Sequence, residues 1–488
     1  MQYKILSPGS VNSSIVLPSS KSISNRALAI GALAGSIASI TNLSDCDDTE
    51  VMQRWLTERP STVDVGAAGT SMRFSTALLA VGQGEHVITG SERMKNRPIK
   101  ILVDALRRLG ADISYVEKEG YPPLRIVGKG GLSYGSVSLP GNVSSQYISA
   151  LMMIGPYLKD GLILTLTDKV ISRPYIEMTM SLMRQFGAKV YWNCSSDESN
   201  GTVDEPCHSN GTINEPCHSN GTVDEPCHSN GTVDELCHSN GTVDEPCHSN
   251  GTVDESLESN SADDKSTESN VIIVEPGRYA VKSFNVESDW SAASYWYEMV
   301  ALSSEGDARV LLPGLYEDSL QGDSKGREVF SLLGVKTEYT KDGVLLSKKT
   351  REVDTLEYDF VKMPDLAQTF VVTCCMMGVP FHFTGLESLK IKETDRIVAL
   401  KNEMAKLGFD LEDRNDSELL WDGRRRALTA EEYDSVAIDT YEDHRMAMAF
   451  APVALVNGSI RINNPHVVSK SYPRYWDNLL AAGFQFEQ

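Results

Sequence analysis

The stretch "ILVDALRRLGADI", from Ile101 to Ile113, joins an amphipathic helical pattern to a strand pattern through a glycine. Its apolar residues recur first at helical spacing and then at strand spacing. The same unit returns in "IEMTMSLMRQFGAKVYW" from Ile176, "REVFSLLGVKTEY" from Arg327 and "IVALKNEMAKLGFDLE" from Ile397. This recurrence of helix, glycine and strand predicts an α/β or α+β protein built from repeated units, in two similar halves.

The chain as a whole is long enough to form two or more domains. It has 488 residues, of which 41% are hydrophobic, so large cores can be buried. It has no run of about 18 consecutive apolar residues, and its start, "MQYKILSPGS", lacks the pattern of a signal or transit peptide. A pI near 4.9 argues against nucleic acid as a partner. We therefore expect a cytoplasmic protein that binds neither membranes nor nucleic acid.

An acidic repeat interrupts the chain. The decapeptide "SNGTVDEPCH" recurs from Ser199, in five Cys-His copies followed by degraded copies that end at Asn270. This segment holds fifteen Asp or Glu and one Lys, so it carries about fourteen of the 22 net negative charges. Because it has few large apolar residues, 199–270 is expected to be a disordered, solvated insert. Its flanks, "GAKVYWN" from Gly187 and "NVIIVEPG" from Asn270, predict two strands, which would place the insert at a hairpin tip.

The nine cysteines do not predict a disulfide scaffold. Five of them belong to the repeat, and Cys46, Cys194, Cys374 and Cys375 show no C-x-x-C spacing, so reduced and mostly buried thiols are expected. The Cys-His pairs of the repeat contain good zinc or copper ligands, but they are adjacent residues without a fixed pocket. We expect no metal site, and a metal-binding or interaction protein acting through the repeat remains an alternative of a different class.

Short loops rich in cations and hydroxyls recur along the rest of the chain. The first, "SSKSISNRALAIGALAG" from Ser19, predicts a polar loop that enters a helix, with Ser24 and Asn25 as caps. A helix start beside lysine, arginine and hydroxyl groups suits a phosphate or a carboxylate. Similar loops are "GAAGTSMR", "RMKNRP", "GNVSSQY", "ISRPY", "IKETDR", "YEDHRMAMAF" and "VVSKSYPRYW". Together they predict one site for a small polyanionic substrate, in which Asp365 and Glu393 are candidates for proton transfer.

Motifs from seven of these loops, together with the segment that holds Asp365, also resemble a known family. They are "SKSISNRA", "AGTSMR", "RMKNRP", "SSQY", "MPDLAQT", "KETDR", "EDHRMAMAF" and "SKSYPRYW". In this order, and over nearly the whole chain outside the repeat, they resemble the 5-enolpyruvylshikimate-3-phosphate synthases. The resemblance implies a transferase that moves the enolpyruvyl group of phosphoenolpyruvate to the 5-hydroxyl of shikimate 3-phosphate. We also expect the protein to be a monomer. It implies release of phosphate without a metal or an organic cofactor.

The resemblance also implies a role for individual residues. Those that would hold shikimate 3-phosphate are Lys21, Ser22, Arg26, Ser144, Ser145, Gln146, Ser172, Asp365 and Lys392. Those that would hold phosphoenolpyruvate are Lys21, Gly69, Arg97, Gln146, Arg396, Arg445 and Lys470. Asp365 would remove the hydroxyl proton, while Glu393, with Lys392 nearby, would protonate the methylene carbon. One carboxylate must then be ionised while the other donates a proton.

The fold that the resemblance implies is the enolpyruvyl transferase fold, an inside-out α/β barrel. It has two globular domains of repeated βαβαββ units, which close over the substrates. By this analogy, residues 1–18 with 287–488 form the first domain, and residues 19–286, with the insert at 199–270, form the second.

The chain departs from the family pattern in places. Between Asp48 and Gly66 it is much shorter than usual, so a strand or a helix of the second domain is expected to be trimmed or missing. Ala67 and Phe74 replace a common asparagine and a common proline, and Ser388 stands where some members have asparagine. The effect of these changes on sensitivity to glyphosate stays open.

A related enolpyruvyl transferase, which uses UDP-N-acetylglucosamine, is the nearest rival function. That enzyme needs a catalytic cysteine on a mobile loop. The matching loop here, "SERMKNRP", contains Arg97 and no cysteine. The sequence therefore favours the shikimate enzyme.

Overall fold

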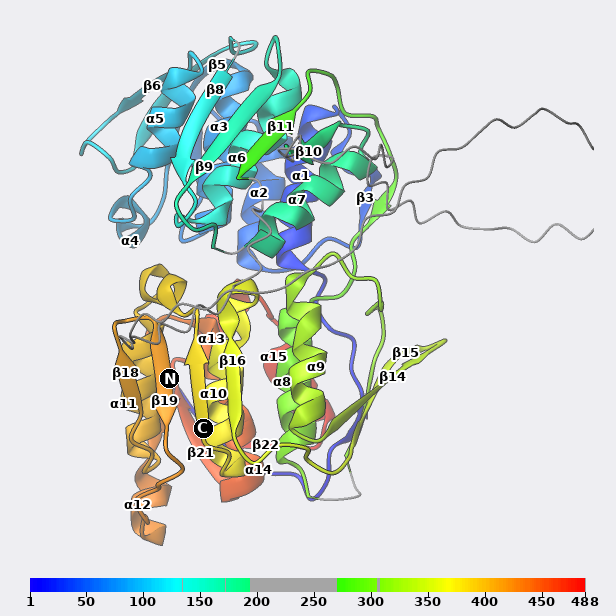
Figure 1. Ribbon diagram of the computed structural model, residues 1–488, viewed down its shortest axis with the longest axis vertical. Coiled ribbons are helices and arrows are strands. Elements are labelled where there is room, and N and C mark those ends of the chain that lie inside the picture. Colours follow the sequence, from blue (N-terminus) through cyan, green and yellow to red (C-terminus); the bar gives the residue numbers. More distant parts are fainter. Residues whose placement is uncertain (134, 172, 194–269, 305–307, 488) are drawn as a thin grey trace, which may run out of the picture. The chain divides into compact units, whose positions relative to one another are not determined.

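The computed structural model describes residues 1–133, 135–171, 173–193, 270–304 and 308–487 (Figure 1). All of these belong to one compact unit. The expected insert, apart from Asn270, and also Ser172 and Cys194 lie outside the described residues. The described chain has two hydrophobic cores: the first core takes residues from Ile5–Leu17 and Trp290–Phe484, and the second core takes residues from Ile23–Val286. The domain boundaries given above remain a prediction.

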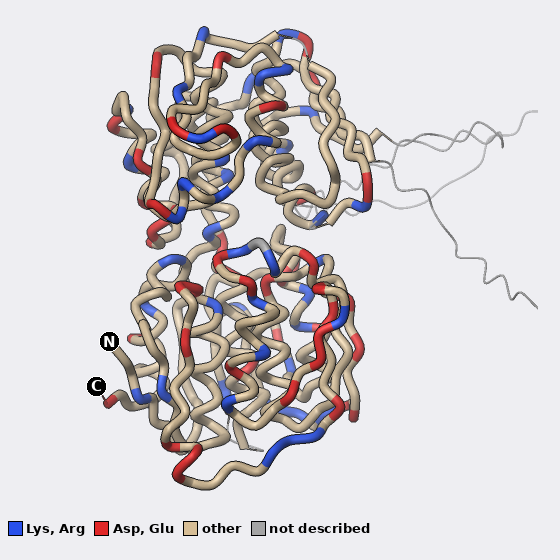
Figure 2. The backbone as a smooth tube through the Cα atoms, turned by 90° about the vertical axis from the view of Figure 1, so that its left-hand side faces the viewer, with Lys and Arg blue, Asp and Glu red and all other residues tan. Residues whose placement is uncertain are grey.

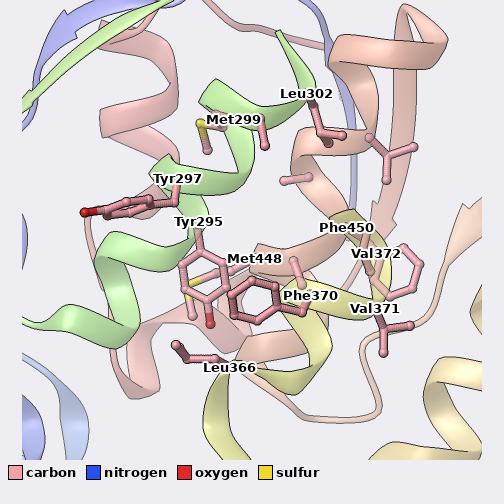
Figure 3. Packing of buried hydrophobic residues seen from close by; sticks show 14 of the residues in the cluster. Tyr295, Tyr297, Met299, Leu302, Leu366, Phe370, Val371, Val372, Met448 and Phe450 are labelled. Carbon is pink, nitrogen blue, oxygen red and sulfur yellow. The ribbon is translucent and has the colours of Figure 1, made fainter. Parts of the chain in front are cut away.

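Each core is built around helices that are buried on nearly every side. In the first core these are α8 (Trp290–Leu302), α10 (Ala367–Met377) and α13 (His444–Phe450), whose side chains Tyr295, Phe370 and Met448 pack together (Figure 3). In the second core they are α1 (Lys21–Leu33), α3 (Gly69–Val81) and α6 (Ser145–Ile154), which also contact one another. A helix that is apolar on all faces is stable only when it is enclosed, so these six helices form the interior.

Sheets pack against these helices. Three four-stranded sheets belong to the first core. Their strand orders are β20 (Ala437–Ile438), β21 (Ser459–Asn463), β1 (Gln2–Leu6), β22 (Gln485–Glu487); β14 (Val335–Thr340), β15 (Gly343–Lys348), β13 (Arg309–Leu312), β2 (Asn12–Ser14); and β16 (Leu356–Asp359), β17 (Phe381–Thr384), β19 (Glu418–Trp421), β18 (Glu412–Arg414).

The second core has two four-stranded sheets and one of two strands. Their orders are β4 (Thr62–Asp64), β5 (Gln83–Thr89), β7 (Leu124–Lys129), β6 (Asp112–Tyr115); β10 (Val190–Trp192), β11 (Val271–Val274), β9 (Leu162–Thr167), β8 (Gly135–Pro140); and β12 (Phe284–Asn285), β3 (Ile40–Thr41). Strands such as β7 and β8 alternate buried and exposed residues, so one face of each sheet lies on the core and the other faces solvent. Helices inside and sheets outside give the inside-out α/β architecture that the motifs implied.

The four helix-glycine-strand units are confirmed. Helices α5 (Lys100–Arg108), α7 (Arg173–Gln185), α9 (Gly326–Leu332) and α11 (Arg396–Lys406) run into strands β6, β10, β14 and β18. The linking glycines have φ angles of +96° at Gly110, +88° at Gly187, +91° at Gly334 and +86° at Gly408. A residue without Cβ adopts this left-handed conformation without a steric penalty, which is why glycine ends each helix.

The predicted start of the first helix is wrong. Helix α1 begins at Lys21, and Ser24 and Asn25 are buried within it rather than capping it. The Ser24 hydroxyl accepts a hydrogen bond from the backbone N–H of Ser44 at 3.0 Å. It therefore serves a tertiary contact, which the local pattern cannot reveal.

Both strands that flank the insert are confirmed. Strands β10 and β11 pair antiparallel, with Trp192 opposite Ile272. Beyond them, the N–H of Asn193 donates to the carbonyl of Val271 at 2.8 Å. The chain thus leaves and re-enters the described structure at the end of one hairpin.

The shortened segment after Asp48 folds as α2 (Asp47–Glu58) followed closely by β4. The sheet formed by β12 and β3 has only two described strands, each of two residues, where the other five sheets have four. Its strand β3 directly precedes, along the chain, the segment where we expected a trimmed element. The remaining helices are α4 (Glu92–Lys95), α12 (Ala430–Ser435), α14 (Ala454–Asn457) and α15 (Tyr475–Ala481).

The cysteines of the described chain agree with the sequence. Cys46, Cys374 and Cys375 are free and buried. In the part of the chain that the structure describes, no helix combines the length and the apolar character needed to cross a membrane.

Candidate active site

A cavity of about 520 Å³ collects residues from the loops of both cores. Most of the predicted site residues line it, namely Lys21, Ser22, Arg26, Gly69, Arg97, Ser144, Ser145, Gln146, Asp365, Lys392, Glu393, Arg396 and Arg445. Lys470 lies at a neighbouring cavity but reaches Glu393, and Ser172 is outside the described residues. Charged residues of both signs occur throughout the described chain (Figure 2), so what distinguishes this cavity is its concentration of buried charge.

The first turns of α1 place two cations in the cavity. Arg26, 2% exposed, donates from Nε to the hydroxyl of Thr179 at 2.7 Å and from Nη1 to the carbonyl of Ser22 at 2.9 Å. Burial lowers the pKa of Arg26 to about 10, so it stays charged at neutral pH. Burial also acts to lower the pKa of Lys21, but nearby groups, led by the carboxylate of Asp48, outweigh it and raise that pKa. Both side chains are therefore cations in fixed positions.

The starts of α3 and α6 add hydroxyl and amide groups. Ser144 caps α6, and the side chain of Gln146 donates to the hydroxyl of Thr70 at 3.0 Å. Gly69 opens α3, where an added Cβ would lie 2.6 Å from Nη1 of Arg97. Only glycine at this position lets the Arg97 guanidinium lie against the helix start, where free N–H groups also favour an anion.

Asp365 is the most heavily bonded carboxylate of the site. Its Oδ1 lies 3.2 Å from both Nζ of Lys392 and Nη1 of Arg396. Its Oδ2 accepts hydrogen bonds from Nη2 of Arg445 at 2.9 Å and from the hydroxyl of Tyr175 at 3.0 Å. Burial tends to raise the pKa of Asp365, but Arg445 and then the other two cations outweigh it and hold the pKa well below its ordinary value.

Glu393 forms the second carboxylate centre. It accepts from Nη2 of Arg396 at 2.9 Å and from Nζ of Lys470 at 2.8 Å. Burial again acts to raise its pKa, and Lys470, followed by Arg396, outweighs burial and lowers the pKa well below the ordinary value. Both carboxylates are therefore ionised at neutral pH. The expected difference between one ionised and one protonated carboxylate is not present in this arrangement of charges.

Arg396 connects these groups. It is 1% exposed and donates from Nε to Oδ2 of Asp443 at 2.7 Å, in addition to its contacts with Asp365 and Glu393. Asp443 also caps α13 by accepting from the N–H of Arg445 at 2.9 Å. One buried carboxylate thus contacts both Arg396 and Arg445, two of the three arginines that the resemblance assigns to phosphoenolpyruvate.

Sequence reasoning missed several residues that line or support this cavity. Tyr175 and Asp443 contact the predicted residues directly. His444, which belongs to the predicted loop "YEDHRMAMAF", lines the cavity with neither ring nitrogen hydrogen-bonded within the described chain. Burial lowers the pKa of His444 well below its ordinary value, and the nearby Lys21 adds to this effect. The loop "YEDHRMAMAF" was predicted from His444 and Arg445, and the signal for Asp443 stood directly before them.

No group of three or more His, Cys, Asp or Glu residues within the described ranges could hold a metal ion. The Cys-His pairs of the repeat lie outside those ranges. The charges of the cavity come instead from cations that face carboxylates.

Fixed cations, two carboxylates and a cavity of this size define an enzyme site for a polyanionic substrate. Comparisons with known proteins identify the family more closely. Residues 5–59, 53–203 and 261–479 match the family described as EPSP synthase (3-phosphoshikimate 1-carboxyvinyltransferase). The chain therefore belongs to the EPSP synthase family, a family of transferases.

Individual relatives agree with this assignment. The 3-phosphoshikimate 1-carboxyvinyltransferase of Bacteroides fragilis strain YCH46 is 49% identical over 484 residues, which cover 99% of this chain and 98% of the relative. The enzyme of the same name from Vibrio campbellii is 31% identical and covers 96% of this chain and 97% of its own. The structure of EPSP synthase from Acinetobacter baumannii covers 100% of both chains with a TM-score of 0.65 at 18% identity, which shows a common fold.

Proposed function

We propose that this protein transfers the enolpyruvyl group of phosphoenolpyruvate to the 5-hydroxyl of shikimate 3-phosphate and releases phosphate. The observation that carries the proposal is a cluster in which Arg396 pairs with both Asp365 and Glu393. Lys392 and Arg445 also pair with Asp365, and Lys470 also pairs with Glu393. Such a cluster suits two anionic substrates that must approach each other. The family relatives are named for this reaction.

The proposed roles of the residues follow the two ends of the cluster. Shikimate 3-phosphate is held by Lys21, Ser22, Arg26, Ser144, Ser145, Gln146, Ser172, Asp365 and Lys392. Phosphoenolpyruvate is held by Lys21, Gly69, Arg97, Gln146, Arg396, Arg445 and Lys470. Support comes from the cavity, which brings together all of these except Ser172, outside the described residues, and Lys470, which reaches it through Glu393.

The proposed chemistry begins at Asp365. Its carboxylate takes the proton of the 5-hydroxyl as the oxygen forms a bond to C2 of phosphoenolpyruvate, and Glu393 gives a proton to C3. In the second step Glu393 takes a proton back from the methyl group, the C2–O bond to phosphate breaks, and the proton on Asp365 leaves with the phosphate. The cations stabilise the negative charge throughout.

Glu393 must be protonated to start this sequence. Its pKa is held low by Lys470 and Arg396, and both are proposed to bind phosphoenolpyruvate. A substrate carboxylate or phosphate competes with Glu393 for the same N–H groups. Binding of the substrate therefore weakens the hold of the cations on Glu393 and raises its pKa toward that of a proton donor.

The test is phosphate release by the purified protein with phosphoenolpyruvate and either shikimate 3-phosphate or UDP-N-acetylglucosamine. We expect release with the first acceptor only. The Asp365→Asn variant should lose roughly 10²- to 10⁴-fold in turnover, the usual contribution of a general base. The matched control is Asp342→Asn, an exposed carboxylate in the turn between β14 and β15, which should leave turnover unchanged. Equal release by the wild-type protein and Asp365→Asn would overturn the role of Asp365.

We further propose two domains, 1–18 with 287–488 and 19–286, that close over the substrates, because each range contains one of the two cores. A cytoplasmic monomer is proposed as well, without nucleic-acid or membrane partners. The free, buried cysteines of the described chain favour a reducing compartment. Sedimentation with and without both substrates tests the monomer and its closure, since closure makes the particle more compact without changing its mass.

A further inference from the structure

Asp323 is a third buried carboxylate beside the cavity, and the reaction proposed above does not use it. It lies in the 3₁₀ turn η3 (Gly322–Lys325) and is 5% exposed. The hydroxyl of Ser291, on α8, donates to its Oδ2. Its Oδ1 is buried and has no hydrogen-bond partner within the described chain. Burying a carboxylate with an unsatisfied oxygen costs free energy, so the role of Asp323 is sought in its contacts with neighbouring groups.

The turn that carries Asp323 is held firmly. The side-chain oxygen of Gln321 accepts from the N–H of Trp290 at 3.0 Å, and its amide nitrogen donates to the carbonyl of Ser288 at 2.8 Å. A Cβ added at Gly322 would lie 2.6 Å from Cβ of Pro174, so the turn is also closely packed against the start of α7. Asp323 is thus fixed between the beginnings of α7 and α8.

A chain of contacts leads from Asp323 to the reacting groups. The oxygen of Ser291 lies 3.5 Å from Nη2 of Arg445, which also donates to Asp365 at 2.9 Å. A serine hydroxyl has one proton and two lone pairs. Because the proton of Ser291 is directed to Asp323, its lone pairs are left to face the guanidinium.

We propose that Asp323 is a positioning residue for the enolpyruvyl transfer, which orients the Ser291 hydroxyl so that it accepts from Arg445 and holds this guanidinium beside Asp365. The inference rests on the proposed function, because Arg445 is assigned there to phosphoenolpyruvate. Asp323 and Ser291 contact neither reacting group in this scheme. They set the place where the substrate carboxylate or phosphate meets Arg445.

The charge of Asp323 has a consequence for pH. The charged and titratable groups that face it are Asp365, Arg445 and Asp289 from the first core and Tyr175 from α7. Burial, followed by repulsion from Asp365, raises the pKa of Asp323 to about 7. As the pH rises through 7, Asp323 gains a negative charge near Arg445, and the affinity for anionic phosphoenolpyruvate should fall.

Two substitutions of Asp323 separate orientation from charge. Asp323→Asn keeps an oxygen that accepts from Ser291 and resembles the protonated acid, whereas Asp323→Ala removes the acceptor. We expect Asp323→Ala to raise KM for phosphoenolpyruvate about tenfold, the size of one lost hydrogen bond to a charged network, with a smaller change in KM for shikimate 3-phosphate. Asp323→Asn should restore KM near the wild-type value at pH 6 and remove the inflection of kcat/KM near pH 7.

A double-mutant cycle with Ser291→Ala tests whether the two residues act as one unit. The rise in KM of the double variant should be no larger than that of the single variant with the larger rise, because both substitutions break the same contact. Glu328→Gln, which changes an exposed carboxylate paired with Lys325 near the same turn, is the matched control and should leave KM unchanged. Melting temperatures of all variants identify any that fail to fold. If Asp323→Ala does not fold, the isosteric Asp323→Asn provides the test, through the presence or absence of the inflection of kcat/KM near pH 7.

The outcomes distinguish this inference from the proposed function. Turnover by the wild-type protein together with an unchanged KM in Asp323→Ala, additive losses in the cycle, or a persisting inflection in Asp323→Asn would overturn the role of Asp323 alone. Absence of turnover in the wild-type protein would overturn the proposed function and this inference with it.

Discussion

At the scale of single residues, the described chain contains two buried glutamates with opposite surroundings. Glu403 on α11 is 0% exposed and has three partners: the N–H of Asp439 at 3.0 Å, the hydroxyl of Tyr441 at 2.6 Å and Nζ of Lys406 at 2.7 Å. Glu298 on α8 is also 0% exposed, and neither of its oxygens has a hydrogen-bond partner in the described chain. Burial raises the pKa of Glu298 well above its ordinary value, so it is held as the neutral acid.

The first prediction concerns Glu298→Met, which replaces the unpartnered acid by an apolar side chain of similar volume. In the unfolded chain a glutamate ionises near pH 4.3. Since the folded-state pKa is raised, the wild-type protein loses stability as the pH rises above that value toward the folded-state pKa. Glu298→Met does not have this loss and should be more stable by roughly 1–3 kcal/mol at pH 8, with a smaller gain at pH 5. Urea unfolding at both pH values measures the difference.

Glu403→Met is the matched control for this experiment. The same substitution removes a carboxylate that has three partners; Lys406 keeps its ion pair with Asp439, but the N–H of Asp439 and the hydroxyl of Tyr441 lose their acceptor. It should destabilise the protein at either pH, by about 1–3 kcal/mol for each group left unsatisfied. A loss of stability in Glu298→Met equal to that in Glu403→Met would contradict the assignment of Glu298 as an unpartnered acid.

At the scale of elements, helix starts build much of the site. Gly69, at the first position of α3, leaves no room for a side chain, because Arg97 and Arg73 lie directly against it. Gly69→Ala places a methyl group within 3 Å of the guanidinium groups of Arg97 and Arg73, so Arg97 must move. We expect KM for phosphoenolpyruvate to rise about tenfold, because a shifted guanidinium loses one charge-assisted hydrogen bond, while KM for shikimate 3-phosphate stays near its original value. Gly9→Ala, where an added Cβ meets no atom within 4 Å, is the control. An equal rise for both substrates would point to a general distortion instead.

Asp443, the cap of α13, gives the third prediction. Asp443→Ala removes the acceptor of the Arg445 N–H and leaves Arg396 without one of its three carboxylates. The protein should lose roughly 3–5 kcal/mol of stability, because a buried ion pair is broken. Thermal unfolding measures this loss, and turnover should fall with it. Thr429→Ala, at the exposed cap of α12, should cost only about 1 kcal/mol. If both variants melt alike, the contacts of Asp443 contribute no more than an ordinary cap.

The elements also show what could be predicted from the sequence. The helix-glycine-strand units and the hairpin at the insert were predictable because their signals are local: periodicity, glycine and β-branched residues. The start of α1 was not predictable, because the Ser24 hydroxyl accepts a hydrogen bond from the N–H of Ser44, twenty residues away, instead of capping the helix. Likewise the positions of Asp365 and Glu393 could be selected, but not their common dependence on Arg396, which arises only when α11 and α13 pack near η5 (Pro364–Leu366).

At the scale of the whole molecule, the repeat is joined to the described chain at the end of the hairpin formed by β10 and β11. Replacing residues 194–269 by an Asn-Gly turn keeps the Trp192 and Ile272 pair and closes the hairpin. Turnover should change by less than about twofold and the melting temperature by less than roughly 2 °C, because insertions at a hairpin tip contribute little to stability. The control for length is the full-length chain in which residues 194–269 are replaced by a Gly-Ser segment of the same number of residues.

The deletion also tests the alternative function of the repeat. Zinc bound per chain should stay at background for both the intact and the shortened protein. Stoichiometric zinc on the intact chain that disappears with the deletion, together with loss of turnover, would support a metal-dependent role for the repeat. The sequence could predict the position of this insert, since its composition differs from that of both flanks, but nothing in its composition predicts a function.

The position of Arg396 constrains how this site can evolve. One guanidinium contacts Asp365, Glu393 and Asp443, so a change at any of these four positions removes at least one ion pair from the centre. Replacing a residue of this centre without loss of function therefore requires several simultaneous substitutions, and such combinations arise only rarely. Variants that discriminate between competing anions are then expected to arise at Gly69, which lies against the guanidinium groups of Arg97 and Arg73 rather than Arg396. The centre around Arg396 is inherited as one block, while a position such as Gly69 can vary by itself.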